Sequence, residues 1–282
     1  MRQILFELPI PGFPIKIFGF GTMLMLAFVG SIWLATWRAR REKLNPEMIS
    51  DLAVWLFLGG LIGARVFFLF QYWQHLHSFW EVFSIWKGGI VFYGSAMGAT
   101  VAFFIYRRLR PFPLLPMLDV VAPSTALGIA FGRLGCFLNG CCWGDRCDIY
   151  PWVVTFPARS APWGSQVKAG LISIDAARSL PIHPTQLYSA LDGFLLLALL
   201  SAYYPIRRRD GEVFGLLLVL YPITRFLIEH LRNDEGAALA GMTISQVISL
   251  VVLGIAVAYW VYLSTRPKTR YADFAEIPEP TA

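Results

Sequence analysis

The chain of 282 residues is 56% hydrophobic and 15% charged, whereas about a quarter of the residues of an ordinary soluble protein are charged. This composition argues against a water-soluble globular protein and predicts a membrane protein. The net charge of +6 does not indicate a nucleic-acid partner, because the basic residues lie in short segments between apolar runs, which is typical of a topology signal.

Seven apolar runs are long enough to cross a bilayer as helices, which takes about 20 residues each. In chain order they are Ile15–Trp37, Leu52–Tyr72, Gly88–Tyr106, Leu114–Phe137, Thr185–Tyr204, Val213–His230 and Ile244–Leu263. The sequence therefore predicts an all-α polytopic membrane protein with about seven transmembrane helices. Residues 1–264 are expected to form one transmembrane domain, followed by a polar tail over residues 265–282.

Clusters of basic residues follow the first, third, fifth and seventh runs, so all four clusters fall on one side of the membrane. The positive-inside rule assigns that side to the cytoplasm. We therefore expect the N-terminus outside, the C-terminus in the cytoplasm, and the long segment 138–184 on the outer face.

Three arginines lie inside predicted helices, namely Arg65, Arg133 and Arg225. A rise of 1.5 Å per residue places all three in the outer half of the membrane. Each could simply reach outward to water or pair with a local acid, as Arg225 could with Glu229 at i, i+4 spacing. Three arginines at similar depth favour an anion site, since guanidinium binds phosphate and carboxylate bidentately. The abundant anion at that depth is a lipid phosphate.

Further polar residues are predicted at the same depth. His183, Gln186 and Tyr188 occur in the stretch IHPTQLYSALDG, where Pro184 suits the first turn of a helix. His183 could be only a helix-entry residue. The alternative is that all three face the anion site.

The third run contains Tyr93 within GGIVFYGSAMGA. Gly94 and Gly98 form a small-xxx-small pair that permits close helix approach. Packing alone would explain these glycines, although they could equally make room for a lipid.

Four cysteines lie in the segment GRLGCFLNGCCWGDRC, one at the end of the fourth run and three after it, with the spacing C-x4-CC-x4-C. This spacing lacks the paired C-x2-C units of common zinc sites, so we expect no bound metal. Disulfides are permitted on the outer face, and we expect at least one, with free buried thiols as the alternative.

Several motifs together resemble those of the bacterial prolipoprotein diacylglyceryl transferase family. GRLGCFLNGCCWG is similar to its signature segment, and HPTQLYSALDG to its entry into a later helix. GEVFGLLLVLYPITRFLIEHLRND and MTISQVIS resemble its last two helical motifs. The resemblance extends from about Ile15 to Leu263, with the motifs in the family's order.

The resemblance implies a multi-pass enzyme of the bacterial inner membrane with its active site toward the outer face. Such an enzyme moves the diacylglyceryl group of phosphatidylglycerol onto the lipobox cysteine in the signal peptide of a preprolipoprotein, and glycerol phosphate leaves; no cofactor is implied. The expected catalytic residues are Arg133, Arg225 and Tyr93. The expected substrate-binding residues are Arg65, Arg133, Asn139, Gly144, His183, Gln186, Tyr188, Glu229 and Arg232.

The chain also departs from the family's pattern. Tyr93 stands where a histidine is usual, Cys136 replaces an asparagine, and Cys141 and Ser189 each replace a glutamate. These changes leave the general base open. A polytopic transporter or anion channel, or a lipid-binding paralogue with altered catalysis, remains the alternative at this stage.

Overall fold

The computed structural model describes residues 4–8, 15–73, 91–232, 239 and 241–274, without the side chains of Leu8, Ile15, Phe92 and Tyr93. The beginning of the predicted third helix, residues 88–90, and the end of the polar tail, residues 275–282, lie outside this description. The described chain divides into two compact units. One comprises Met1–Ala35 and Leu118–Phe274, and the other is Thr36–Met117.

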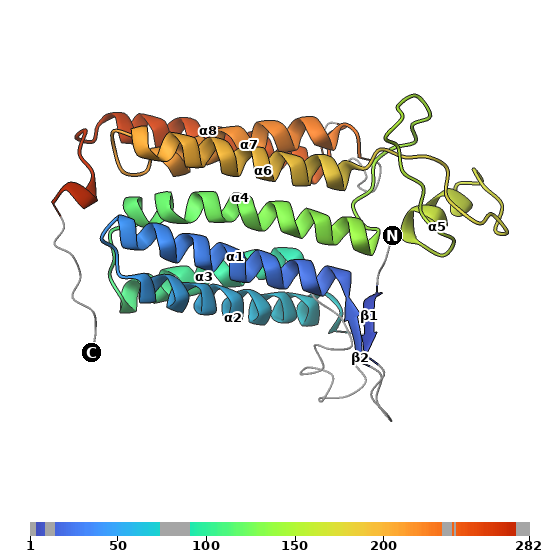
Figure 1. Cartoon of the computed structure of the whole chain (residues 1–282), viewed down its shortest axis with the longest axis horizontal. Helices are drawn as coiled ribbons and strands as arrows, with labels where there is room; N and C mark the ends of the chain where they lie inside the picture. The colour runs from blue at the N-terminus through green and yellow to red at the C-terminus, as the bar shows by residue number, and fades with distance from the viewer. Residues whose placement is uncertain (1–3, 9–14, 74–90, 233–238, 240, 275–282) are drawn as a thin grey trace. The chain divides into compact units, whose positions relative to one another are not determined.

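Long helices occupy the seven predicted runs in the described part of the chain (Figure 1). They are α1 (Gly19–Arg41), α2 (Pro46–Gln71), α3 (Phe92–Leu109), α4 (Leu114–Asn139), α6 (Thr185–Tyr203), α7 (Glu212–Glu229) and α8 (Ile244–Ser264). By length and composition, α1, α2, α4, α8 and the stretch formed by α6 with the following turn η4 (Tyr204–Ile206) could each cross a membrane. A mostly helical, multi-pass protein is thus confirmed. Membrane crossing by α3 and α7, and the orientation of the termini, stay predictions.

The start of the first helix was predicted wrongly at Ile15, because a short β-hairpin precedes the helix. Strands β1 (Ile4–Leu8) and β2 (Ile15–Phe18) form an antiparallel hairpin, and α1 begins only at Gly19. Lys16 separates two isoleucines, a period-two pattern that suits a strand. It lies opposite Glu7 in the register, and the two side chains form an ion pair of 3.7 Å.

The segment between α4 and α6 has structure that the sequence analysis did not predict. It contains the short helix α5 (Ala161–Lys168). Isolated bridges join Val154 to Ile182 and Pro157 to Arg178, which closes the segment on itself. Phe156 and Ile182 are each 1% exposed and form its small core.

Within the larger unit, α1 and α4 run antiparallel and in contact. The Ser31 hydroxyl donates to the Ser124 carbonyl at 2.8 Å, and toward the other end Gly135 lies against Phe20. A Cβ on Gly135 would lie 3.2 Å from the Phe20 ring, so this glycine permits the approach. The turn of α4 that carries Arg133 is thereby held beside the start of α1.

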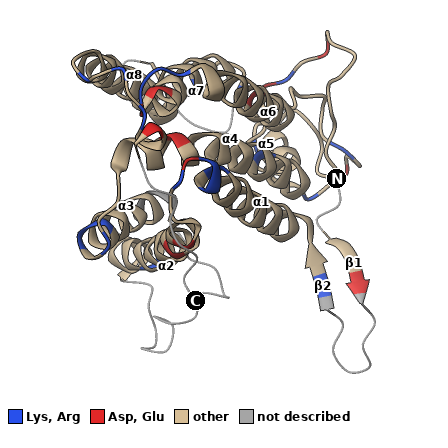
Figure 2. Ribbon diagram, turned by 60° about the vertical axis from the view of Figure 1, so that its left-hand side comes forward, with Lys and Arg blue, Asp and Glu red and all other residues tan. Residues whose placement is uncertain are grey.

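Helices α6, α7 and α8 pack in sequence order, with α7 in contact with both neighbours (Figure 1). Gly193 of α6 also meets α4, because a Cβ there would lie 2.8 Å from the backbone nitrogen of Ala130. Charged residues are rare along these helices and gather near their ends (Figure 2).

One end of this helix group is fixed by a buried carboxylate. Asp119, in the second turn of α4, accepts hydrogen bonds from the backbone N–H groups of Gly211 and Phe214 at 2.7 and 3.0 Å. The guanidinium of Arg207 lies 3.4 Å from the same carboxylate. The start of α4 and the start of α7 therefore lie at one end, and the end of α4 points to the other.

Two of the predicted basic clusters meet at this end. Arg209 follows α6 and donates from Nε to the backbone carbonyl of Arg266, which follows α8, at 3.1 Å. The short 3-10 helix η5 (Tyr271–Asp273) is tied to the same region, since the Tyr271 N–H donates to Asp210 at 2.6 Å. Part of the predicted polar tail is therefore held by hydrogen bonds between its backbone and the side chains of Arg209 and Asp210.

In the smaller unit, α2 and α3 pack through glycines. A Cβ on Gly63 would lie 2.7 Å from the Cα of Gly98, and one on Gly98 would lie 2.8 Å from the Cα of Gly63. The predicted close helix approach at Gly94 and Gly98 is thus confirmed, with packing as its physical reason.

Candidate functional site

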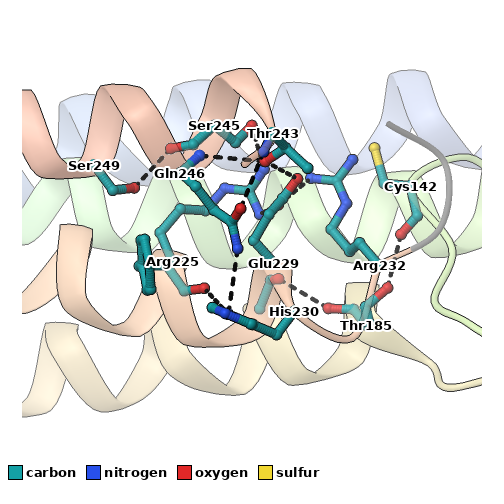
Figure 3. Close-up of polar contacts among 12 residues, drawn as sticks. Cys142, Thr185, Arg225, Glu229, His230, Arg232, Thr243, Ser245, Gln246 and Ser249 are labelled. Carbon is teal, nitrogen blue, oxygen red and sulfur yellow. Dashed lines mark hydrogen bonds and ion pairs between the residues drawn. The ribbon is translucent and has the colours of Figure 1, made fainter. Parts of the chain in front are cut away.

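The centre of the candidate site is an ion pair within α7. Arg225 and Glu229 are four residues apart, and Nη1 of the arginine binds the carboxylate (Figure 3). Nη2 donates to the hydroxyl of Ser245 in the first turn of α8, at 2.9 Å. Arg225 is therefore held in place by its own helix and by the next one.

The carboxylate of Glu229 accepts further hydrogen bonds. It accepts from Nη1 of Arg232 at 3.2 Å and from the hydroxyl of Thr243 at 3.1 Å. The glutamate side chain is fully buried, and those of Arg225 and Arg232 are 11% and 4% exposed. One carboxylate thus binds two guanidinium groups from the same stretch of the chain.

Arg133 brings a third guanidinium group toward this cluster. It lies in α4, two turns before the helix ends at Asn139, and is half-buried. Arg133 and Arg232 both act electrostatically on Arg225 as like charges. Among the described residues, the Arg133 side chain has no hydrogen-bonding or ion-paired partner. Because unbalanced charge is costly away from water, the cluster Arg133, Arg225, Arg232 and Glu229 is suited to binding an anion.

Gly144 joins three parts of the chain beside this cluster. Its N–H donates to the carbonyl of His183 at 3.1 Å, and the next N–H, of Asp145, donates to the carbonyl of Leu231 at 2.8 Å. A Cβ on Gly144 would lie 2.6 Å from the His183 carbonyl oxygen and 2.8 Å from that of Leu231. Gly144 therefore permits close backbone contact and does not itself bind a ligand through a side chain.

Replacing Gly144 should break this junction. We expect Gly144→Val to lower the melting temperature by several degrees and to reduce activity, because the new side chain would meet two backbone carbonyls that cannot move aside independently. Thermal unfolding of the detergent-solubilised chain measures the effect. Gly164→Val is the matched control, since a Cβ at Gly164 meets nothing within 4 Å. Equal losses in the two variants would contradict the assignment.

His183 and Tyr188 lie together at the entry to α6. Nδ1 of His183 is 3.3 Å from the Tyr188 hydroxyl, which also accepts from Nε1 of Trp152 at 2.8 Å. Tyr150 stacks on Trp152 with ring centroids 4.9 Å apart. The two predicted residues are thus brought together, in an aromatic group that anchors the segment between α4 and α6.

Gln186 and Thr185 bind the turn that follows α4. Nε2 of Gln186 donates to the carbonyl of Cys141 at 2.7 Å, and the Thr185 hydroxyl donates to that of Cys142 at 2.9 Å. Gln186 is fully buried, and in the described part of the chain its Oε1 has no hydrogen-bond partner. This oxygen can accept a hydrogen bond from a ligand or a water molecule.

The expected disulfide is not present, because all four cysteines are free thiols. The Sγ atoms of Cys136, Cys141 and Cys142 lie within 4.8 Å of one another. The Sγ of Cys141 donates to the backbone carbonyl of Cys136 at 3.7 Å. Cys147 is buried outside this group, and its N–H donates to the carbonyl of Pro181. The three thiols thus lie close together, and their positions do not favour a disulfide between one particular pair.

Two predicted site residues belong to the smaller unit. Arg65 is 8% exposed, and its guanidinium lies 5.1 Å from the centre of the Phe68 ring. Tyr93 lies in the first turn of α3, and its side chain is outside the described structure. That these two residues act with Arg133 stays a prediction.

Sequence reasoning did not single out Thr243 and Ser245 as site residues. Thr243 is the N-cap of α8 and forms a capping box with Gln246, so its backbone position is fixed. The signal was the T-x-x-Q spacing within the motif MTISQVIS, which marks a helix start. Thr243 binds the side chain of Glu229, and Ser245 binds that of Arg225. The two residues therefore join α8 to the ion pair of α7.

The fold and the cluster define a class: a multi-pass helical membrane protein with a group of arginines near the ends of α4 and α7. Comparison with known proteins gives the family. The model of the prolipoprotein diacylglyceryl transferase family matches residues 3–262, and the chain belongs to this family.

Curated relatives carry the same description. A phosphatidylglycerol–prolipoprotein diacylglyceryl transferase of Clostridium tetani is 31% identical over 257 residues, which cover 90% of this chain and 96% of the relative. A protein of that name from Nostoc sp. is 32% identical, with 90% and 88% covered. Another from Legionella pneumophila is 33% identical, with 88% and 93% covered.

Proposed function

We propose that the chain transfers the diacylglyceryl group of phosphatidylglycerol to the lipobox cysteine thiol of preprolipoproteins and releases glycerol phosphate. Family membership supports the reaction. The structural observation that supports the proposal is the guanidinium of Arg133, which acts on Arg225 as a like charge and has no hydrogen-bonding or ion-paired partner among the described residues. A transporter or channel is not favoured, because the family and its relatives are transferases.

The arginines match the charge that the reaction develops. The substrate sulfur forms a bond to the terminal glycerol carbon of the diacylglyceryl group, while the bond from that carbon to the phosphate oxygen breaks. The bonding pair stays on the phosphate, which changes from a diester to a monoester and gains negative charge. Guanidinium groups positioned beforehand stabilise such charge most where water is excluded. Arg133 binds the headgroup phosphate in this account, and Arg225 supports it from α7.

The thiol proton needs a separate acceptor. Glu229 is a poor candidate because Arg225, Arg232 and Thr243 already bind its carboxylate. Tyr93 occupies the family's histidine position, but an unperturbed tyrosine has a pKa of about 10 and stays protonated at neutral pH. We therefore propose that Tyr93 orients the thiol or phosphate by hydrogen bonding.

The transfer assay tests the proposal. Purified chain in vesicles of phosphatidylglycerol labelled in its acyl chains should attach the label to a lipobox peptide. A peptide with serine in place of the lipobox cysteine is the matched control and should remain unlabelled. Labelling of both peptides, or of neither, would refute the proposed reaction.

We further propose that the site faces the outer side of the bacterial inner membrane. The contact between Arg209 and Arg266 shows that two basic clusters share one end of the helix group, and the positive-inside rule assigns such an end to the cytoplasm. Reporter fusions at Gly164 should therefore be active outside and fusions at Asp210 inside. The reverse pattern would overturn the orientation.

A further inference from the structure

The thiol cluster of Cys136, Cys141 and Cys142 has no role in the proposed transfer, whose nucleophile belongs to the substrate. All three Sγ atoms lie within 4.8 Å of one another, so one ion between them could contact all three. Each of the three residues is only partly buried, which leaves a path for an ion to enter.

The end of α4 makes the thiols converge. The carbonyl of Cys136 accepts the N–H of Gly140 at 2.9 Å and that of Cys141 at 3.2 Å. Gly140 has a φ of +80°, the left-handed conformation that ends many helices. This turn folds the chain back over the last helical turn, so that Cys141 returns to Cys136 although four residues lie between them. The sequence spacing does not show this proximity, because the helix end supplies it.

Residues of α6 fix the backbone of Cys141 and Cys142. Cys142 also has a positive φ, +58°, which is costly for a residue with a side chain. The Thr185 hydroxyl fixes its carbonyl at 2.9 Å, and the Gln186 amide fixes that of Cys141 at 2.7 Å. The backbone of both cysteines is thus positioned by buried donors before any ligand binds.

We propose that Cys136, Cys141 and Cys142 form a three-thiolate site for a soft monovalent cation, of which Cu(I) is the probe. Thiolates select soft metal ions such as Cu(I). Structural zinc sites almost always have four protein ligands, and in the described part of the chain no fourth cysteine, histidine or carboxylate joins this group. Binding replaces the three thiol protons with one cation and releases the protons to solvent.

The test is metal binding on the full-length chain in detergent, reduced and free of oxygen, which does not depend on the transfer reaction being active. Titration with Cu(I) against a chromophoric Cu(I) chelator should show one ion bound per chain. Cys136→Ser and Cys141→Ser should each weaken that binding by more than about ten-fold, because each removes a ligand. Cys147→Ser is the matched control and should bind as the unchanged chain does. X-ray absorption of the loaded chain should show three sulfur neighbours.

Several results would overturn the site. They are the absence of one-to-one Cu(I) binding, an equal loss in Cys147→Ser, and Zn(II) bound more tightly than Cu(I) in parallel chelator competitions. A disulfide between any two of the three cysteines in protein purified from its native membrane without added reductant, found by mass spectrometry before reduction, would overturn it as well. X-ray absorption of the unchanged chain keeps the test valid even if a serine variant fails to fold.

Discussion

Arg133→Ala should lower the rate of diacylglyceryl transfer by about 10²–10³-fold or more while the protein stays folded in the membrane. Removing one well-placed donor to a developing anion typically costs that much. Arg133 has no internal partner among the described residues, so its loss leaves no buried acid behind. The rate of acyl-label transfer to a lipobox peptide, compared at equal membrane abundance, measures the effect.

Arg133→Lys separates charge from geometry. A lysine keeps the charge but lacks the planar fork that binds phosphate bidentately, so it should restore little of the activity. Arg146→Ala is the matched control, because Arg146 is an exposed arginine that pairs with Asp148 at 2.8 Å. Near-normal transfer by Arg133→Ala would contradict the role of Arg133, and a loss of similar size in Arg146→Ala would show that the effect is not local.

Glu229→Gln should destabilise the fold by about 3–5 kcal/mol, the typical cost of breaking a buried ion pair from one side. The change removes the counter-charge of Arg225 and Arg232 while both guanidinium groups remain buried. Transfer activity should fall with it, since Arg225 would lose the contact that orients it. Denaturant unfolding in detergent measures the change in free energy.

An exposed acid provides the comparison. Asp148→Asn removes a carboxylate that is 51% exposed, and surface ion pairs contribute only about 0–1 kcal/mol. The free energy of unfolding should therefore hardly change in Asp148→Asn. If Glu229→Gln is no less stable than Asp148→Asn, the carboxylate does not hold the arginine cluster together.

The helices could be predicted because each needs a long apolar run, and the observed bounds of α4 and α6 lie within two residues of the prediction. Hydropathy alone could not distinguish the strand Ile15–Phe18 from a helix start, since both are apolar and only the pairing with Ile4–Leu8 decides. The short helix α5 lies in a polar segment where hydropathy gives no signal.

Within the site, the pairing of Arg225 with Glu229 could be read from their spacing, because i, i+4 residues face each other on any helix. The contacts of Glu229 with Thr243 and of Arg225 with Ser245 join different helices and depend on packing. The convergence of the cysteines depends on a single left-handed turn at Gly140, which sequence spacing does not show.

The fate of the lipid headgroup tests the central claim most directly. Purified chain, lipobox peptide and phosphatidylglycerol labelled in the headgroup phosphorus should release one labelled glycerol phosphate for each thioether formed, and none without peptide. That result shows that the phosphate is the leaving group, which is the charge that the arginines are proposed to stabilise. Three outcomes would contradict it: labelled lipid that crosses the vesicle membrane intact, labelled glycerol phosphate released without peptide, and label found in the peptide. Each of them describes a different reaction or no reaction.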